Sequence, residues 1–407
     1  MAERDFDLVI YGASGFVGRR AVRYVAAHAA ASGLRWAIAG RDRAKLEPLA
    51  EASGGIPVLV AAANDRAAID AIVARTRVVL AMAGPFSLYA DNLVDACVRL
   101  GTDYTDITGE TPWIKSLIDR HHERAAQAGT RIVPACGFDS VPSDIGAYVV
   151  ARYAQRELAL ESADVKAFFQ ASGGLNGGTL ATLMQVARDP VQGAQLRDPE
   201  LLNPAGMRSP NTEALRDPVV ASFDGDVVAW IAPFVMGPIN TRVVRRSAAL
   251  FAQWGEPYGP NFAYQEYMAF PGPFGAALAT TVAAGTIIAQ TSLALGSTRG
   301  LLQPLVPKPG TGPSEYAIEH GWFRCELFAR TAGVRCVRGL IADRGDPGNA
   351  ATVKFACEAA FALALDKAEL PGGASRGGVL TPATALGDVL VRRLHDAGMT
   401  LEASLAV

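Results

Sequence analysis

The sequence predicts an α/β protein in which an N-terminal doubly wound parallel sheet precedes a second α+β domain built on a mostly antiparallel sheet. Two observations predict this fold. Over the first 150 residues, short apolar runs alternate with segments of helical periodicity, and glycines stand where the helices should end. After about residue 160, clusters of Gly, Pro and Asn become frequent, and the strand patterns become aromatic and alternating. The 407 residues suffice for two or three domains, which we place at 1–150, 151–345 and 346–407.

The first domain is predicted to contain six strands and five helices in alternation. Apolar runs without polar alternation, such as 78–83, indicate strands that are buried on both faces, as in a parallel sheet covered by helices. The predicted strands are 6–11, 36–40, 57–62, 78–83, 103–107 and 131–135. The predicted helices are 16–31, 43–52, 66–74, 91–100 and 112–128.

The second domain is predicted from strand patterns of alternating polarity. Two such patterns, at 322–331 and 334–343, flank Ala332-Gly333, and this spacing is typical of a hairpin. Between Ser172 and Thr179, glycines predict either a flexible turn or a loop that holds a substrate phosphate. Further strands are predicted at 165–172, 227–234 and 262–270, and helices at 179–188, 350–365 and 382–397. We expect the last two helices to pack back on the first domain.

Composition and charge narrow the class of protein. The chain has 38 basic and 40 acidic side chains, so a net charge of −2 argues against a nucleic-acid partner. Five cysteines are scattered without a C-x-x-C pair, which indicates reduced thiols and argues against a disulfide framework or a metal site. The first residues lack the pattern of a secretory signal. A cytoplasmic protein without a bound metal is therefore expected.

One apolar segment, 267–298, contains no charged residue and no histidine over 32 positions. Its length would allow a membrane span. Gln290, several Thr and Ser residues and the modest hydrophobicity of alanine favour instead a buried helix or a segment that contacts a lipid surface. Peripheral membrane contact through this segment is therefore an open alternative to a wholly cytoplasmic location.

A glycine-rich turn joins the first predicted strand to the first predicted helix. In the spacing G-x-x-G-x-x-G, the first glycine permits the tight turn, the second lets the backbone approach a pyrophosphate, and the third lets the helix pack closely on the sheet. The helix N-terminus then offers free N–H groups to the phosphates of a dinucleotide. The alternative is a turn that serves packing alone. The motif consists of Gly12, Ala13, Ser14, Gly15, Phe16, Val17 and Gly18.

The end of the second predicted strand indicates which dinucleotide is bound. NAD sites place a carboxylate there for the ribose hydroxyls, whereas here the strand is followed by Arg41, Asp42 and Arg43. Arg41 is suited to a 2′-phosphate through charge-assisted hydrogen bonds, which favours NADP(H) as the cofactor. In the alternative, Asp42 binds the ribose and both arginines are solvated.

Further cofactor contacts are expected where other strands end, because ligands bind at the carboxyl edge of open parallel sheets. Asn64 or Asp65 is expected to border the adenine. The turn after the fourth strand and the start of the segment after the sixth should run beside the cofactor; these residues are Ala83, Gly84, Pro85, Phe86, Cys136 and Gly137.

Three titratable residues at the same edge, Tyr104, Asp106 and Asp139, are the candidates for proton transfer. In the alternative, the two aspartates and Ser143 cap helices, as such residues commonly do at strand-to-helix turns. Cys136 is more typical of a small buried residue than of a nucleophile. The pair His121-His122 lies on a predicted helix and is expected to be a surface pair rather than a metal site.

Several blocks of sequence, taken in order, resemble the saccharopine dehydrogenase-like oxidoreductases. More specifically, the chain resembles the bacterial branch called trans-acting enoyl reductases, to which segments 239–246 and 378–383 are also similar. The resemblance therefore covers nearly the whole chain. The blocks are 12–18, 39–41, 83–86, 104–106 with 109–110, and 137–144.

The resemblance implies an NADPH-binding Rossmann domain with an inserted, mostly antiparallel second domain. It also implies an enoyl reductase that acts beside a polyketide synthase, with the trans-2-enoyl chain held as a thioester on an acyl carrier protein or coenzyme A. Hydride would go to Cβ of that chain and a proton to Cα, with the thioester oxygen stabilised as an oxyanion. A homo-oligomer is also expected.

Two other functions remain open from the sequence. One is an NADP-dependent oxidoreductase for C–N or C=O bonds, closer to saccharopine chemistry, in which Arg242, Arg245 and Arg246 face a substrate with two carboxylates. For Arg245 and Arg246 the alternative is a solvated edge. The other is a non-catalytic NADPH-binding protein that docks on a membrane through its apolar segment.

Overall fold

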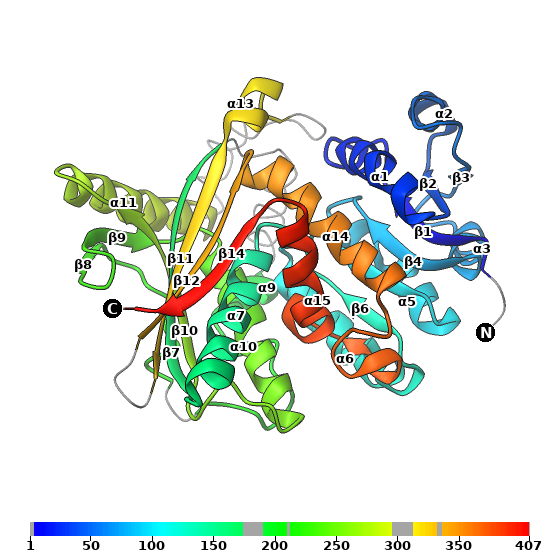
Figure 1. Cartoon of the computed structure of the whole chain (residues 1–407). Coiled ribbons are helices and arrows are strands. Elements are labelled where there is room, and N and C mark those ends of the chain that lie inside the picture. The colour runs from blue at the N-terminus through cyan, green and yellow to red at the C-terminus, as the bar shows by residue number, and fades with distance from the viewer. Residues whose placement is uncertain (1–3, 174–189, 210–211, 295–311, 332–335, 407) are drawn as a thin grey trace.

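The computed structural model describes residues 4–173, 190–209, 212–294, 312–331 and 336–406. They form two seven-stranded sheets, called sheet A and sheet B, with helices between and around them (Figure 1). Every strand pair in sheet A is parallel, whereas sheet B is antiparallel except for one pair. The predicted fold class is therefore confirmed.

Sheet A contains the six predicted N-terminal strands and one strand from the C-terminal tail. Its order reverses at β1, which pairs with β2 on one side and with β4 on the other. A crevice for ligands forms at the carboxyl ends of strands where such a reversal occurs. In spatial order the strands are β13 (Gly378–Val379), β6 (Arg131–Val133), β5 (Asp103–Asp106), β4 (Thr76–Ala81), β1 (Phe6–Tyr11), β2 (Trp36–Gly40) and β3 (Val58–Val60).

Two hydrophobic clusters cover the two faces of sheet A. On one face, Leu8 and Leu80 belong to a cluster that includes α1 and α14 and continues without a break to Phe169 on the inner face of sheet B. On the other face, Val9 and Val79 pack with α3, α5 and α6. The helices of this half are α1 (Gly18–Ser32), α2 (Arg43–Ala52), α3 (Arg66–Ala74), α4 (Phe86–Tyr89), α5 (Asp91–Leu100) and α6 (Thr111–Ala128).

Sheet B lies beside the first domain, with its inner face covered by α7 (Figure 1). Its one parallel pair joins β7 and β10 in the middle of the sheet. In spatial order the strands are β14 (Thr400–Leu405), β12 (Cys336–Arg344), β11 (Trp322–Thr331), β7 (Ser162–Ser172), β10 (Ala263–Phe270), β9 (Ala229–Pro233) and β8 (Ser222–Asp224). The helices are α7 (Val141–Leu158), α9 (Pro190–Gln195), α10 (Gly237–Gln253), α11 (Gly275–Ala294) and α13 (Glu315–His320).

Most predicted elements agree with the observed ones to within a few residues. The first helix begins at Gly18 and not at residue 16, because residues 12–17 form the turn itself. The hairpin of β11 and β12 is confirmed by their antiparallel pairing. Its turn at 332–335 lies outside the described residues, as do the helix predicted at 179–188 and most of the glycine-rich stretch at 172–179.

The C-terminal tail was expected to be helical, but it also supplies one strand to each sheet. After β12 the chain forms a π-helix (Pro347–Ala351), α14 (Thr352–Leu365) and a short 3-10 helix (Gly373–Ser375). β13 then joins β6, α15 (Pro382–Asp396) packs on α7 and α14, and β14 joins β12. A two-residue strand such as β13 has no periodicity that a sequence could display. The three-part domain division remains a prediction.

The described part of the apolar segment 267–298 contains the end of β10 and the helix α11, which extends along β9 on the side away from sheet A (Figure 1), and residues 295–298 lie outside the described residues. Ala279 and Ala283 are buried, whereas Phe274, Leu278 and Ile288 are at least half exposed. In the part of the chain that the structure describes, no helix is long and apolar enough to cross a membrane. Contact of α11 with lipid remains a prediction.

Two glycines allow α7 to approach sheet B closely. A Cβ on Gly146 of α7 would lie 2.8 Å from Cδ2 of Leu327, and a Cβ on Gly339 of β12 would overlap Cγ1 of Val150. Val150 is buried and β-branched on a helix, so its side chain has little freedom to move away. The position of α7, which carries part of the site described below, therefore depends on these glycines.

Gly339→Ala should lower the free energy of unfolding by about 1–3 kcal/mol, because the added methyl group overpacks a closed interface. Urea unfolding followed by circular dichroism measures the change. The control is Gly225→Ala, because a Cβ at Gly225 meets no atom within 4 Å. Equal stability of the two variants would show that α7 and sheet B have room to adjust.

Candidate functional site

The glycine-rich turn between β1 and α1 has the geometry of a pyrophosphate-binding loop. Gly12 has a φ of +82°, and a Cβ there would lie 2.8 Å from the backbone nitrogen of Ala83. A Cβ on Gly18 would overlap the carbonyl oxygen of Gly12, so the start of α1 lies closer to the turn than a side chain permits. At Gly15, by contrast, a Cβ would meet only two carbonyl oxygens, the nearer at 3.3 Å. The turn therefore requires glycine at positions 12 and 18. At Gly15 the absent side chain leaves the backbone open to a ligand.

The second domain contacts this turn through Phe16. The guanidinium of Arg20 lies 4.1 Å from the centre of the Phe16 ring and forms an ion pair with Glu315 of α13. A Cβ on Gly312 would overlap the same ring. The cofactor turn is therefore held from outside by the segment that leads into α13.

Arg41 is the free cation at the end of β2. The carboxylate of Asp42 lies 3.3 Å from Nζ of Lys45, and the guanidinium of Arg43 lies 3.4 Å from the carboxylate of Glu47. Arg41 is exposed and makes no ion pair with any residue that the structure describes. This arrangement fits a 2′-phosphate on Arg41 better than a ribose on Asp42.

The turns after β3 and β4 are held by side chains of their own. The carboxylate of Asp65 accepts a hydrogen bond from the N–H of Ala68 at 3.0 Å, so Asp65 caps α3, while Asn64 is exposed. After β4, the buried carboxylate of Glu110 accepts hydrogen bonds from the N–H groups of Phe86 and Ser87. The turn 83–86 is thus fixed beside Gly12. Cofactor contacts by these residues remain predictions.

Tyr104 and Asp106 form a closed, fully buried network. The Tyr104 hydroxyl donates to Oδ2 of Asp106 at 2.7 Å, and Oδ1 accepts from the N–H groups of Thr108 and Ala135, both at 3.0 Å. Burial raises the pKa of Asp106 to about 7, against the effect of these hydrogen bonds. The network joins the ends of β5 and β6. A part in proton transfer remains a prediction for these two residues, and their complete burial favours a structural role.

Cys136 and Gly137 lie at the end of β6, packed against the C-terminal tail. Cys136 is buried, and burial raises the pKa of its thiol far above the ordinary value. A Cβ on Gly137 would lie 3.3 Å from Ile107 and 3.4 Å from Cγ2 of Thr352. Thr352 also accepts a hydrogen bond from the N–H of Phe138 at 3.1 Å. No local pattern indicated Thr352, because it lies more than 200 residues further along the chain.

Asp139 is the carboxyl group of this edge that has no polar partner. It is half-buried and makes no hydrogen bond or ion pair with the described residues of the chain. A Cβ on Gly109 would lie 3.4 Å both from Oδ2 of Asp139 and from Cδ1 of Ile239, with Cε of Met236 at 3.9 Å. The bare backbone of Gly109 thus lies close both to this carboxyl group and to two apolar side chains at the start of α10. Burial raises its pKa to about 6 from an ordinary value of 3.8.

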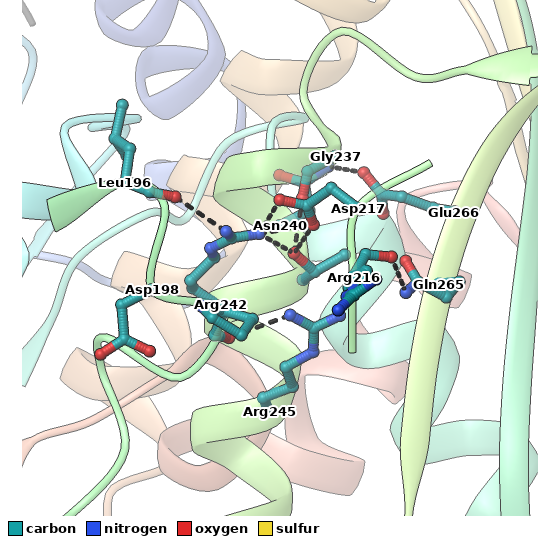
Figure 2. A network of polar contacts seen from close by, with 12 residues as sticks. Leu196, Asp198, Arg216, Asp217, Gly237, Asn240, Arg242, Arg245, Gln265 and Glu266 are labelled. Atoms are coloured by element: carbon teal, nitrogen blue, oxygen red, sulfur yellow. Dashed lines mark hydrogen bonds and ion pairs between the residues drawn. The ribbon is translucent and has the colours of Figure 1, made fainter. Parts of the chain in front are cut away.

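The solvated edge that was one alternative for Arg245 and Arg246 is wrong, because both side chains are buried. That the three arginines of α10 face a substrate remains a prediction. All three are buried, and Figure 2 shows two of them among the residues they hold. Arg242 donates to both carboxylate oxygens of Asp217 at 2.6 Å. Arg242 also donates to Oγ1 of Thr241, and Arg246 to Nδ1 of His122. Further hydrogen bonds go to carbonyl oxygens of Leu196 from Arg242, of Pro199 and Tyr264 from Arg245, and of Leu202 and Val379 from Arg246. Burial deprives the arginines of water, and the carbonyl oxygens replace it.

The histidine pair also differs from its prediction. His121 is only 4% exposed, and His122 accepts a hydrogen bond from the N–H of Val379 through Nδ1. His122 contacts β13, which the sequence does not predict, whereas the charges that act on His121 include Asp91 and Asp95 of α5. Among the described residues there is no group of three or more His, Cys, Asp or Glu side chains that could hold a metal ion.

Arg41→Ala should raise the Kd for NADPH about 10- to 100-fold and leave the Kd for NADH unchanged, because it removes a charge-assisted hydrogen bond to the 2′-phosphate. Fluorescence titration measures both constants. The matched control is Arg43→Ala, whose guanidinium already pairs with Glu47. Equal losses for the two cofactors would assign the ribose to Asp42 instead.

Comparisons with known proteins agree with this geometry. Residues 8–133 match the family described as the saccharopine dehydrogenase NADP binding domain. The chain is 40% identical to Rv2449c of Mycobacterium tuberculosis, a provisionally named trans-acting enoyl reductase, over 98% of this chain and 97% of that one. It is 35% identical to a trans-acting enoyl reductase of Mycobacterium ulcerans, over 99% of both chains.

A solved structure supports the fold over the whole length. Saccharopine dehydrogenase (L-Glu forming) from Saccharomyces cerevisiae superposes with a TM-score of 0.54 at 14% identity, over 98% of this chain and 99% of that one. At this identity the likeness concerns the fold alone, whereas the mycobacterial relatives define the branch. The protein is an NADP-dependent oxidoreductase, and its chain belongs to the saccharopine dehydrogenase-like family, in the branch of the trans-acting enoyl reductases.

Proposed function

We propose that the protein uses NADPH to reduce the C=C bond of a trans-2-enoyl chain, held as a thioester on an acyl carrier protein or coenzyme A, during polyketide or lipid synthesis. The observation that carries this proposal is Asp139. Its carboxyl group has a raised pKa and no hydrogen-bond partner among the described residues. It lies at the edge of the sheet where the cofactor is expected, close to Gly109 and the apolar side chains beside it. The names of the mycobacterial relatives support the same reaction.

The residues of the turn and of β2 would bind and orient the cofactor. The N–H groups around Gly15 and the positive end of α1 suit the pyrophosphate, and Arg41 suits the 2′-phosphate. With that half of the cofactor held at β1 and β2, the ends of β4, β5 and β6 across the switch point would hold the nicotinamide half. Gly109 and Asp139 follow β5 and β6 in the chain, so they are the residues we expect on that side of the site.

When bound, NADPH supplies the hydride that Cβ of the enoyl chain accepts. Asp139 would then give the proton that Cα needs, which leaves an aspartate to be reprotonated from solvent through its exposed part. A carboxyl group with a pKa of about 6 is suited to this role, because it is partly protonated near neutral pH. Together, the hydride on Cβ and the proton on Cα would saturate the double bond.

The surroundings of Asp139 favour an apolar substrate over one with two carboxylates. Ile239 and Met236 line the point where Asp139 meets Gly109. The arginines of α10, which a dicarboxylate substrate would need, are occupied by Asp217 and by backbone carbonyl groups. The alternative of saccharopine-like chemistry therefore has less support. Oligomeric state and the carrier partner remain predictions.

The reaction is tested by following NADPH absorbance with trans-2-enoyl thioesters of increasing chain length, on coenzyme A and on an acyl carrier protein. In parallel, an α-keto acid with an amino acid serves as the substrate pair of saccharopine-like chemistry. Oxidation of NADPH with the enoyl thioester alone is expected. Oxidation only with the keto acid and amine would overturn the proposal.

Asp139→Asn should lower kcat/KM for the enoyl thioester about 10²- to 10⁴-fold, because the amide cannot donate the proton. For the wild type, kcat/KM should be constant below about pH 6 and fall above it, as the carboxyl group loses its proton. The variant should lose this dependence. A variant with wild-type rates and pH profile would exclude Asp139 as the acid.

The same pKa gives a check on folding. Because the folded-state pKa lies above 3.8, the charged form is disfavoured in the native state, and stability should fall as pH rises from about 4 to about 6. Asp139→Asn should therefore keep or raise the Tm at pH 8, which separates lost activity from lost folding. The control is Asp5→Asn, which removes one exposed partner of Arg75.

A further inference from the structure

A buried polar network centred on Glu266 of β10 reaches Ser140, the residue that follows Asp139 in sequence. Oε2 of Glu266 accepts hydrogen bonds from Ser143 at 2.7 Å and from Tyr264 at 3.0 Å, and Oε1 accepts one from Nδ2 of Asn240 at 2.8 Å. The amide oxygen of Asn240 in turn accepts a hydrogen bond from the hydroxyl of Ser140 at 3.3 Å. Part of this network is visible in Figure 2, where Asn240 and Glu266 are labelled.

The carboxyl group of Glu266 is costly to bury, because no positively charged side chain that the structure describes pairs with it. Glu266 is 1% exposed, and it forms no salt bridge within the described chain. Burial raises its pKa to about 7. The charged and titratable groups facing it are Asp217, whose charge raises this pKa, Tyr264, and Arg245, which donates instead to backbone carbonyl groups. An apolar side chain would fill this position at less cost, so a carboxylate here calls for a reason beyond stability.

The two ends of the network lie at the starts of α7 and α10. Ser140 follows Asp139 directly in sequence, and Ser143 lies in the first turn of α7. Asn240 follows Ile239, which with Met236 forms the apolar side of the space around Asp139. Glu266 accepts hydrogen bonds from both helix starts, so it fixes the distance between the acid and its apolar surroundings.

We propose that Glu266 is a positioning residue, which holds Asp139 at the nicotinamide edge by tying the first turn of α7 to the first turn of α10. Its role in catalysis rests on the proposed function, but its effect on Asp139 does not. Glu266 is buried, and its hydrogen bonds go to Ser143, Tyr264 and Asn240 and not to Asp139, so it would act on Asp139 through the two helix starts.

Two substitutions separate hydrogen bonding from mere filling of space. In Glu266→Gln, the amide oxygen can still accept from Ser143 and Tyr264. Its NH₂ group can donate to Asn240 if that amide turns over, after which Ser140 becomes the acceptor of the last hydrogen bond. Glu266→Leu has a similar size but breaks every link. If Glu266 positions Asp139, then Glu266→Gln should keep the pKa of Asp139 and the kcat near their wild-type values, whereas Glu266→Leu should change both.

The experiment measures the pKa of Asp139 by carboxyl ¹³C NMR, together with the NADPH Kd and, with the enoyl thioester, kcat and its pH profile. Glu266→Leu should shift the pKa of Asp139 by at least half a unit and lower kcat about tenfold or more, with NADPH Kd unchanged. Glu266→Gln should remain within about threefold of wild type. Ser140→Ala, a small change that preserves packing, should shift the pKa in the same direction as Glu266→Leu.

A matched control is Glu326→Leu with Glu326→Gln on β11, because this carboxylate pairs with Arg324 and Arg338 instead. These variants should leave the pKa of Asp139 unchanged. If Glu266→Leu and Ser140→Ala lower only the Tm and leave the pKa of Asp139 at its wild-type value, Glu266 is structural and the proposal fails. If instead the pKa shifts but wild-type protein reduces no enoyl thioester, the positioning holds and the proposed function fails.

Discussion

The continuous hydrophobic core between sheet A and sheet B is the constraint on which the site depends. It joins Leu8 and Leu80 of the parallel sheet to Phe169 of the antiparallel one, with α7 and α14 packed between them. Because these helices begin at the carboxyl edge of sheet A, the packing of the core determines which side chains meet there. The half-buried position of Asp139, and with it the raised pKa, follows from this arrangement rather than from any charged neighbour.

Buried polar groups then hold the segments that the core alone would leave free. Arg242 and its neighbours hold the segment from Leu196 to Asp217 against α10, and Glu110 holds the turn after β4. The terminal guanidinium nitrogens donate to carbonyl and carboxylate oxygens, and the Glu110 carboxylate accepts from N–H groups. Only Nε of each of these arginines has no hydrogen-bond partner among the described residues. Asp139 differs from them in having no such partner in the described chain. A group that gains nothing from its own burial is a strong candidate for function.

Local patterns were enough to predict much of the fold. The glycine turn and the alternation of strands and helices are local features, and the first two strands have the predicted bounds, 6–11 and 36–40. The role of each carboxylate was not predictable, because it depends on distant contacts. Asp106 and Asp139 look alike in sequence, yet only Asp106 is bonded to the N–H of Ala135, which lies 29 residues further along the chain. The two-residue strand β13, which contacts His122, is too short to show a periodicity in the sequence.

The most direct test of the account is a crystal structure with NADP⁺ and a non-reactive acyl thioester bound. The account predicts the 2′-phosphate on Arg41, the pyrophosphate over Gly15 and the nicotinamide beside Gly109. The carboxyl group of Asp139 should lie close enough to Cα of the acyl chain to transfer a proton, either directly or through one bridging water. A nicotinamide bound away from Asp139, or a thioester bound on the far face of sheet B, would contradict it.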